Sequence, residues 1–117
     1  MSHVPLINPE QRAELFANGA RANAGQDTDP APVVKLFTPD ADATWLLCEL
    51  DPDDPDLAFG LCDLGHGTPE LGHVLISEIA AVRGRLGLPV ERDLYFKATG
   101  PISRYADDAR RAGRIVA

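Results

Sequence analysis

The chain has 117 residues, a net charge of −7 and an apolar fraction of 44%. This length supports one hydrophobic core and is too short for two typical domains, so we expect a single domain over residues 1–117. The apolar content is high enough to offset the entropy of ordering the chain, which excludes disorder of the whole sequence.

A helix is predicted near the N-terminal end of the sequence. Asn8 can cap it, Pro9 suits the first helical position, and Gln11 can reach back as in a capping box. Apolar residues then recur with helical spacing to about Ala22. Gly25 is expected to end the helix.

Three strands are predicted after this helix, joined by short turns. Residues 33–37 and 44–50 are rich in valine, leucine and aromatic residues, and residues 57–64 form a third run of this kind. Between the second and third runs lies the turn Asp-Pro-Asp-Asp-Pro-Asp at 51–56. Aspartate and proline are common in turns for local conformational reasons.

Side-chain alternation within the strands predicts which residues share a face of the sheet. In the second strand, Cys48 is expected to lie on the same face as Leu46 and Leu50. In the third strand, Gly60 indicates a bulge or a close approach of two backbones.

The remaining elements are shorter and less regular. Residues 70–76 predict a fourth strand and residues 78–83 a short helix, and residues 93–96 form either a fifth strand or a short helix. A final helix is predicted over 103–114. Short turns between strands favour antiparallel pairing, because parallel pairing requires long crossovers.

The predicted fold class is therefore α+β. We expect an antiparallel meander of three to four strands, flanked by an N-terminal helix, a short middle helix and a C-terminal helix. The end segments 1–7 and 113–117 are expected to be loosely ordered.

The compartment is predicted from what the sequence lacks. No apolar run approaches the ~18 residues that span a bilayer. Residues 1–9 lack the basic segment and apolar stretch of a secretory signal. Cys48 and Cys62 are too few for a disulfide framework, so we expect a cytoplasmic protein with reduced thiols and no membrane partner.

Charge is unevenly distributed along the chain. Residues 1–35 carry −1, residues 36–82 carry −10 without any Lys or Arg, and residues 83–117 carry +4. An acidic field repels nucleic acid and attracts basic surfaces. We therefore expect a basic protein partner and no direct binding of nucleic acid.

The run from Phe37 to Tyr105 resembles a small bacterial family known only as a domain of unknown function. The matching stretches are FTPDADATWLL at 37–47, LDP at 50–52, AFGLCDLG at 58–65, PELG at 69–72 and LGLPVERDLYF at 86–96. Members of this family are often encoded on plasmids and other mobile elements. The resemblance implies no activity, catalytic residue or cofactor.

Two groups of residues suggest metal binding as an alternative. The carboxylates of the 51–56 turn could bind a hard divalent cation, although the turn lacks the glycine of a calcium loop. Two thiols and two imidazoles, Cys48, Cys62, His66 and His73, form a ligand set that zinc accepts, although no CxxC or HxxxH pair occurs.

No arrangement for nucleophilic catalysis or phosphate binding is apparent. A pair such as Cys62 and His66 would need a third group to orient the imidazole. Ser77 and Ser103 are predicted to be helix caps. The phosphate-loop motif GxxxxGK[ST] is absent. We therefore expect neither enzymatic activity nor a cofactor.

The first functional hypothesis is a small acidic interaction module that binds a basic partner protein. Its sharpest form is a role in plasmid or phage biology, such as countering a host defence system. The alternative is a metal-binding domain or a metal-dependent enzyme that uses either ligand group above. The residues expected at the interaction surface are Asp51, Asp53, Asp54, Asp56, Asp63 and Glu70.

Overall fold

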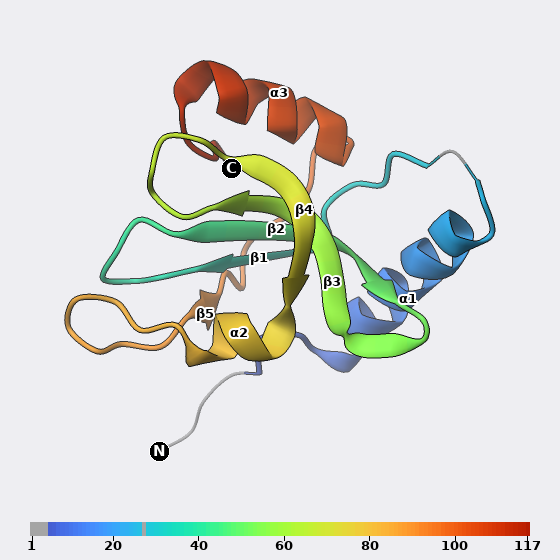
Figure 1. The fold of residues 1–117 in the computed structure, drawn as a ribbon, viewed down its shortest axis with the longest axis horizontal. Coiled ribbons are helices and arrows are strands. Elements are labelled where there is room, and N and C mark those ends of the chain that lie inside the picture. Colours follow the sequence, from blue (N-terminus) through green and yellow to red (C-terminus); the bar gives the residue numbers. More distant parts are fainter. Residues whose placement is uncertain (1–4, 27) are drawn as a thin grey trace.

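The computed structural model describes residues 5–26 and 28–117, and it confirms the predicted α+β class (Figure 1). The elements, in chain order, are α1 (Pro9–Asn23), β1 (Val34–Phe37), β2 (Thr44–Asp51), β3 (Asp54–Asp63), β4 (Glu70–Leu75), α2 (Ile76–Ala81), β5 (Glu91–Arg92) and α3 (Ile102–Ala112). Among the described residues, no helix combines the length and the apolar character needed to cross a membrane.

The strands form one antiparallel sheet in the order β4-β3-β2-β1-β5. The first four are the predicted meander, and β5 adds a fifth strand, so the sheet is larger than the three to four strands expected. The prediction of a strand or helix at 93–96 is wrong, because the strand lies at Glu91–Arg92. The Asp93 carboxylate accepts a hydrogen bond from the Tyr95 N–H at 2.9 Å, and this local turn ends the strand.

The N-terminal capping box of α1 is confirmed. The Asn8 side chain accepts a hydrogen bond from the Gln11 N–H at 2.7 Å, and the Gln11 side chain accepts one from the Asn8 N–H at 3.0 Å. At the other end, α1 stops at Asn23, and Gly25 adopts a φ of 80° that glycine tolerates best.

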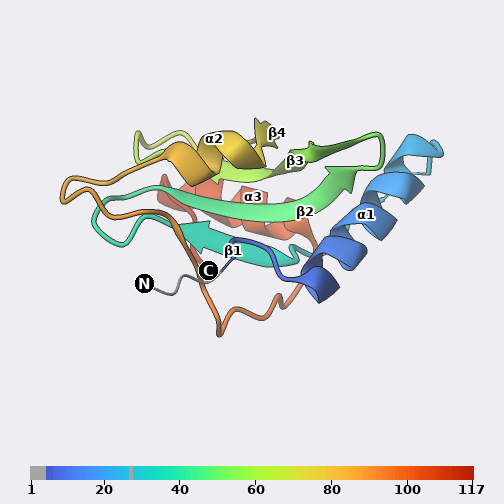
Figure 2. The same ribbon diagram turned by 90° about the horizontal axis from the view of Figure 1, so that it is seen from below.

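Helix α1 lies across the end of the β2–β3 hairpin (Figure 2). The crossing is so close that a Cβ atom built on Gly19 would lie 1.8 Å from the Leu50 carbonyl oxygen. Next to it, the buried Asn18 amide donates a hydrogen bond to the Cys48 carbonyl at 2.9 Å. The glycine that weakens α1 as an isolated helix is therefore required for its packing.

A β-bulge at Cys48 makes this contact possible. Leu47 pairs with Gly60 and Glu49 with Phe59, which leaves Cys48 as an extra residue in β2. Its carbonyl is then available to Asn18. Gly60 lies opposite the bulge, and a Cβ atom there would be 2.1 Å from the Leu46 carbonyl oxygen, so the predicted close approach is confirmed.

The bulge also corrects the predicted faces of β2. Cys48 and Leu46 do share one hydrophobic cluster, as expected. Leu50, however, belongs to the cluster on the other face. An extra residue inverts the alternation of every side chain that follows it, so strict alternation fails after Cys48.

Both faces of the sheet are covered, and α2 and α3 lie on opposite sides of its strands (Figure 1). Helices α1 and α2 contribute to one cluster, whose buried members are Ile7, Leu15, Val34, Leu36, Trp45, Leu47, Leu50, Ala58, Ile79 and Val90. Helix α3 covers the other, whose buried members are Leu46, Cys48, Leu61, Ile102, Tyr105, Ala106, Ala109 and Ile115. Ile7 and Ile115 belong to the segments 1–7 and 113–117, which were expected to be loosely ordered, yet both side chains are buried in these clusters. Residues 1–4 lie outside the described part of the chain.

Candidate interaction surface

Three exposed or half-exposed carboxylates gather at the end of the β2–β3 hairpin, namely Asp51, Asp53 and Asp54, here called the acidic hairpin end. Asp51 pairs with Asp54, so the hairpin turn is shorter than the predicted 51–56 segment and consists of Pro52 and Asp53. The Asp51 carboxylate accepts a hydrogen bond from the Asp53 N–H at 2.8 Å, which fixes the turn.

Glu70 lies far from the acidic hairpin end. It pairs with Cys62, eight residues along β3 from Asp54, which corresponds to roughly 26 Å in an extended strand. The acidic residues of the 36–82 segment therefore occupy both ends of the sheet. They do not form one continuous acidic face.

Asp63 does not belong to the surface, because it is only 4% exposed. Its carboxylate accepts hydrogen bonds from the backbone N–H groups of Gly65 and Ile115, both at 2.9 Å. The carboxylate thereby attaches the C-terminal segment to the end of β3. Nothing in the local sequence indicated this role, since Ile115 is 52 residues away.

Asp56 lies in an irregular part of β3, where the register shifts between the Asp51–Asp54 and Leu50–Ala58 pairs. It accepts hydrogen bonds from the Ser77 backbone N–H at 2.8 Å and from the Ser77 hydroxyl at 2.6 Å. Ser77 was predicted to cap α2. The helix instead begins at Ile76, so Ser77 lies inside it, and the N-cap residue Leu75 provides no side-chain hydrogen bond. A distant carboxylate satisfies the helix N-terminus instead.

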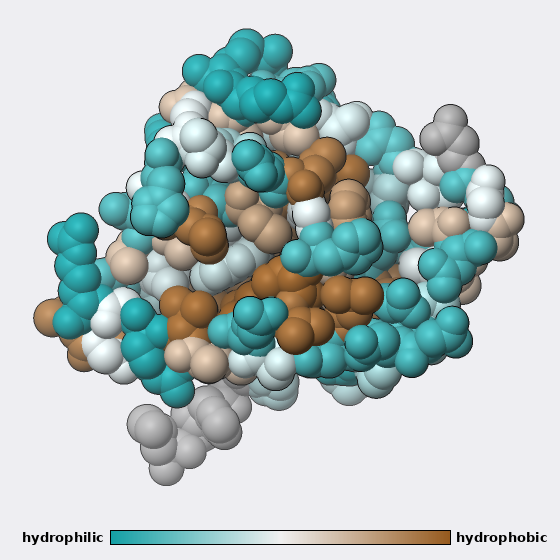
Figure 3. All heavy atoms as spheres, viewed as in Figure 1, coloured by the Kyte–Doolittle hydropathy of each residue, from teal (hydrophilic) through white to brown (hydrophobic). Residues whose placement is uncertain are grey.

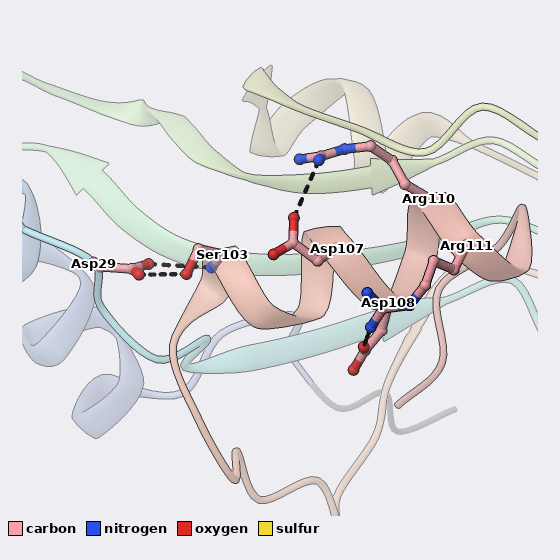
Figure 4. A network of polar contacts seen from close by, with 6 residues as sticks. All are labelled: Asp29, Ser103, Asp107, Asp108, Arg110 and Arg111. Atoms are coloured by element: carbon pink, nitrogen blue, oxygen red, sulfur yellow. Dashed lines mark hydrogen bonds and ion pairs between the residues drawn. The ribbon is translucent and has the colours of Figure 1, made fainter.

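The same arrangement occurs at α3. The Asp29 carboxylate accepts hydrogen bonds from the Ser103 backbone N–H, at 3.1 Å, and from the Ser103 hydroxyl (Figure 4). The prediction that Ser103 caps the helix is thus wrong as well, since the N-cap position is Pro101. In both helices the serine is the donor, and the capping anion comes from another part of the chain.

The acidic residues of the 36–82 segment form no ion pair within the described residues. One ion pair there joins Lys35 to Asp93. The others, drawn in Figure 4, join Arg110 to Asp107 and Arg111 to Asp108. None of these carboxylates belongs to the 36–82 segment. Five of the segment's acids instead accept backbone hydrogen bonds, namely Asp40, Asp51, Asp54, Asp56 and Asp63. Hydrogen bonding to N–H groups leaves their negative charge uncompensated.

Glu49, Phe59 and His73 form a row across three strands, which the sequence analysis did not single out. Glu49 pairs with Phe59 and Phe59 pairs with His73, whose ring meets the phenyl ring edge-on at a centroid distance of 5.0 Å. Burial raises the pKa of the Glu49 carboxyl, and the nearby His73 partly opposes this rise. The hollow beside the row measures about 40 Å³, too small for anything beyond a water molecule or two.

The four potential zinc ligands are not brought together. Cys48 lies in the cluster under α3, whereas Cys62 packs against the cluster on the opposite face of the sheet. Burial raises the pKa of Cys48 to about 12 and also raises the pKa of Cys62, so both thiols resist ionisation. In the described chain, no three His, Cys, Asp or Glu side chains gather in a metal-binding arrangement. The metal alternative therefore gains no geometric support.

A hollow of about 640 Å³ lies at the end of the sheet opposite the acidic hairpin end and is lined by charges of both signs. Its Lys35 ammonium donates to the Ala117 carbonyl at 2.7 Å and lies 3.6 Å from the Asp93 carboxylate. Asp63 lines it too, with both oxygens already accepting hydrogen bonds. These groups are used to hold the chain together, and they do not define a ligand class.

The comparisons with known proteins identify the family without assigning an activity. A search of curated proteins finds no match, and neither does a search of solved structures. The family model described as "Protein of unknown function (DUF2958)" matches residues 6–116, which is nearly the whole chain. The protein therefore belongs to the DUF2958 family.

Proposed function

We propose that this protein is an interaction module that binds a basic partner protein. The observation that carries the proposal is the uncompensated charge of residues 36–82, which hold ten acidic residues without a Lys or Arg. No ion pair among the described residues involves any of them. Unpaired surface charge of one sign steers and selects partners of the opposite sign.

The acidic hairpin end is the part of this charge best placed to meet a partner. Asp53 and Asp54 are exposed at the tip, and Asp51 lies beside them. Helix α1 fixes the position of the hairpin through the close contact of Gly19 with Leu50. A rigid acidic projection loses little entropy when it binds a basic groove.

The biological setting that we propose is plasmid or phage biology, for example the neutralisation of a host defence protein. This part rests on the resemblance to a family often encoded on mobile elements. The charge argument is independent of it, since a basic partner could belong to any pathway.

The test compares two charge-matched variants as bait for partner capture. Asp51→Asn/Asp53→Asn/Asp54→Asn removes three charges but keeps the side-chain oxygens that accept the turn hydrogen bonds. The control Glu14→Gln/Glu91→Gln/Asp107→Asn removes three exposed charges elsewhere. We expect a basic protein to be retained by the parent and the control and lost with the hairpin variant.

Salt provides the second readout. Retention of the partner is expected to fall steeply between roughly 0.05 and 0.5 M salt, because screening shortens the range of surface charge. The proposal fails if no retained protein depends on both the salt concentration and the hairpin carboxylates.

A further inference from the structure

Strand β4 (Glu70–Leu75) is one of the two edge strands of the sheet. None of its six residues is buried. In the described part of the chain, the backbone groups of Glu70 to Val74 form no hydrogen bond outside the ladder with β3. In an antiparallel pair, alternate residues direct their N–H and C=O groups away from the partner strand, so β4 presents a row of free donors and acceptors.

The strand lacks the features that normally protect such an edge. It contains no lysine, arginine or proline, its pairing with β3 runs without a bulge, and its only acidic residue is Glu70 at its start. Natural sheets use charge, proline, bulges or a covering element to prevent pairing at an edge. An unprotected edge of six residues matches the length of a typical strand.

Side chains of an added strand would find apolar surface on both faces of β4. On the α3 side, a groove of about 510 Å³ is lined by the apolar Leu61, Leu71 and Ala106, of which Leu71 is 40% exposed, and at its rim by the charged Glu70 and Arg110. On the other side, the half-buried Val74 and Ile76 lie next to the core. Figure 3 shows hydrophobic surface, in brown, in the region where Figure 1 places β4, β3 and α2.

The charges at the two ends of β4 indicate the chemistry of the occupant. Glu70 lies at the start of the strand, and Asp56 is held next to its end by Ser77. Glu78 follows on the exposed side of α2. A strand laid along β4 would therefore meet three carboxylates spread over both ends, and one cation, Arg110, next to Glu70. This disfavours a second copy of the chain, whose own acidic ends would be brought against these, and favours a segment with Lys or Arg at its ends.

We infer that β4 receives an extended basic segment of the partner, which adds a sixth strand to the sheet. Main-chain hydrogen bonds to the free edge would provide affinity, and alternating apolar side chains would enter the groove beside α3. This inference rests on the proposed function and specifies which part of a basic partner is bound and where.

The test uses the full chain and a synthetic peptide, Lys-Lys-Val-Thr-Val-Thr-Val-Lys-Lys. We expect its NMR titration to shift the amide signals of Glu70–Leu75 and to slow their hydrogen exchange. The same peptide with N-methyl groups on alternate residues cannot form the ladder, and its affinity should be at least about tenfold lower. A peptide with Glu in place of every Lys should bind more weakly by a similar factor.

A matched pair of variants locates the site. Leu71→Lys/His73→Lys places two positive charges on exposed positions of β4 and should weaken binding of the basic peptide about tenfold. Leu94→Lys/Tyr95→Lys makes the same charge change in an exposed turn away from β4 and should leave the affinity unchanged. Thermal melting verifies that both variants are folded.

Three results would overturn the inference. The first is salt-sensitive peptide binding that shifts the acidic hairpin end but not β4, or that tolerates N-methylation, in which case the proposed function stands. The second is the absence of peptide binding at low salt, which leaves the proposed function to be decided by partner capture. The third is a concentration-dependent dimer abolished by Leu71→Lys/His73→Lys, which would make a second copy the occupant.

Discussion

At one edge of the sheet two charged residues of β5 close the ladder, whereas at the other edge the six residues of β4 remain uncovered within the described structure. At the closed edge, Arg92 donates a hydrogen bond to the Pro5 carbonyl at 2.8 Å, and the Asp93 N–H donates to the Lys35 carbonyl at 2.9 Å. Lys35 in turn holds the Ala117 carbonyl. Short length and internal pairing therefore protect this edge.

The difference shows where the chain uses its charges internally. Near β5 the cations are satisfied by carbonyls and by Asp93 of the same chain. Near β4 the carboxylates cap helices and turns but form no ion pair among the described residues. The β5 edge is protected by short length and internal hydrogen bonds, and within the described chain the β4 edge has neither. This difference makes the open edge a candidate for function.

The largest effect is expected from separating β3, and with it β4, from β2. Gly60→Ala would place a Cβ atom 2.1 Å from the Leu46 carbonyl oxygen and should destabilise the fold by about 2–3 kcal/mol. Gly72→Ala is the matched control, because Gly72 pairs with Gly60 and has open space around it. Urea unfolding should show a large loss for the first and almost none for the second. Equal losses would mean that the close approach at Gly60 is unimportant.

A smaller effect is expected where α2 meets the end of β4. Asp56→Ala removes the acceptor for the Ser77 N–H and hydroxyl and should cost about 1–2 kcal/mol. Hydrogen exchange should speed up over Ile76–Ala81. Asp29→Ala removes the equivalent acceptor at α3, so it should lose similar stability while increasing exchange in α3 instead. Unchanged exchange in α2 after Asp56→Ala would contradict the cap.

The closed edge should respond more weakly. Arg92→Ala removes the hydrogen bond to Pro5 and should cost no more than about 1 kcal/mol, because the contact is exposed to solvent. Arg85→Ala is a suitable control, since Arg85 forms no hydrogen bond within the described residues. The comparison of urea midpoints decides the outcome, and identical values for the two variants would show that Arg92 does not secure the edge.

The smallest effect is expected in the row Glu49, Phe59 and His73, which crosses β2, β3 and β4. Burial raises the pKa of Glu49, so its contribution to stability is present below the ordinary value of 4.5 and is lost as the pH rises through the folded-state pKa. Glu49→Gln should therefore stabilise the protein at pH 7, by less than about 1 kcal/mol because solvent screens a half-exposed group. The gain should shrink below pH 4.5.

His73 gives this last prediction an internal control. The charged form of the imidazole opposes the rise in the Glu49 pKa, so in mildly acidic solution, at about pH 5–6, Glu49→Gln should stabilise a His73→Gln background more than it stabilises the parent. Thermal melting at these pH values and at pH 7 measures the difference. A Glu49→Gln variant that is less stable at pH 7 than the parent would show that the ionised carboxylate is favoured in the fold.

The local parts of the fold could be predicted from the sequence, and the contacts between distant residues could not. Asn8 and Gln11 are three residues apart, so their capping box is visible in the chain itself. The face occupied by Leu50 depends on a bulge that only the pairing of β2 with β3 creates. The caps of α2 and α3 come from carboxylates 21 and 74 residues away, which no local pattern reveals.

The same distinction applies to the candidate surface. The excess of acidic residues in 36–82 is a property of composition, and the sequence predicts it directly. Composition does not show that Asp63 is buried under Ile115, nor that Glu70 lies at the far end of β3 from Asp54. The open edge of β4 is a property of strand order, which no single segment contains.

The position of Pro5 and Ala117 has a practical consequence. Both are held beside β1 and β5, through Arg92 and Lys35. They therefore lie at the edge of the sheet away from β4. A label attached at Pro5 or Ala117 would leave β4 free, so a binding assay that reads such a label should not obstruct the edge it is meant to probe.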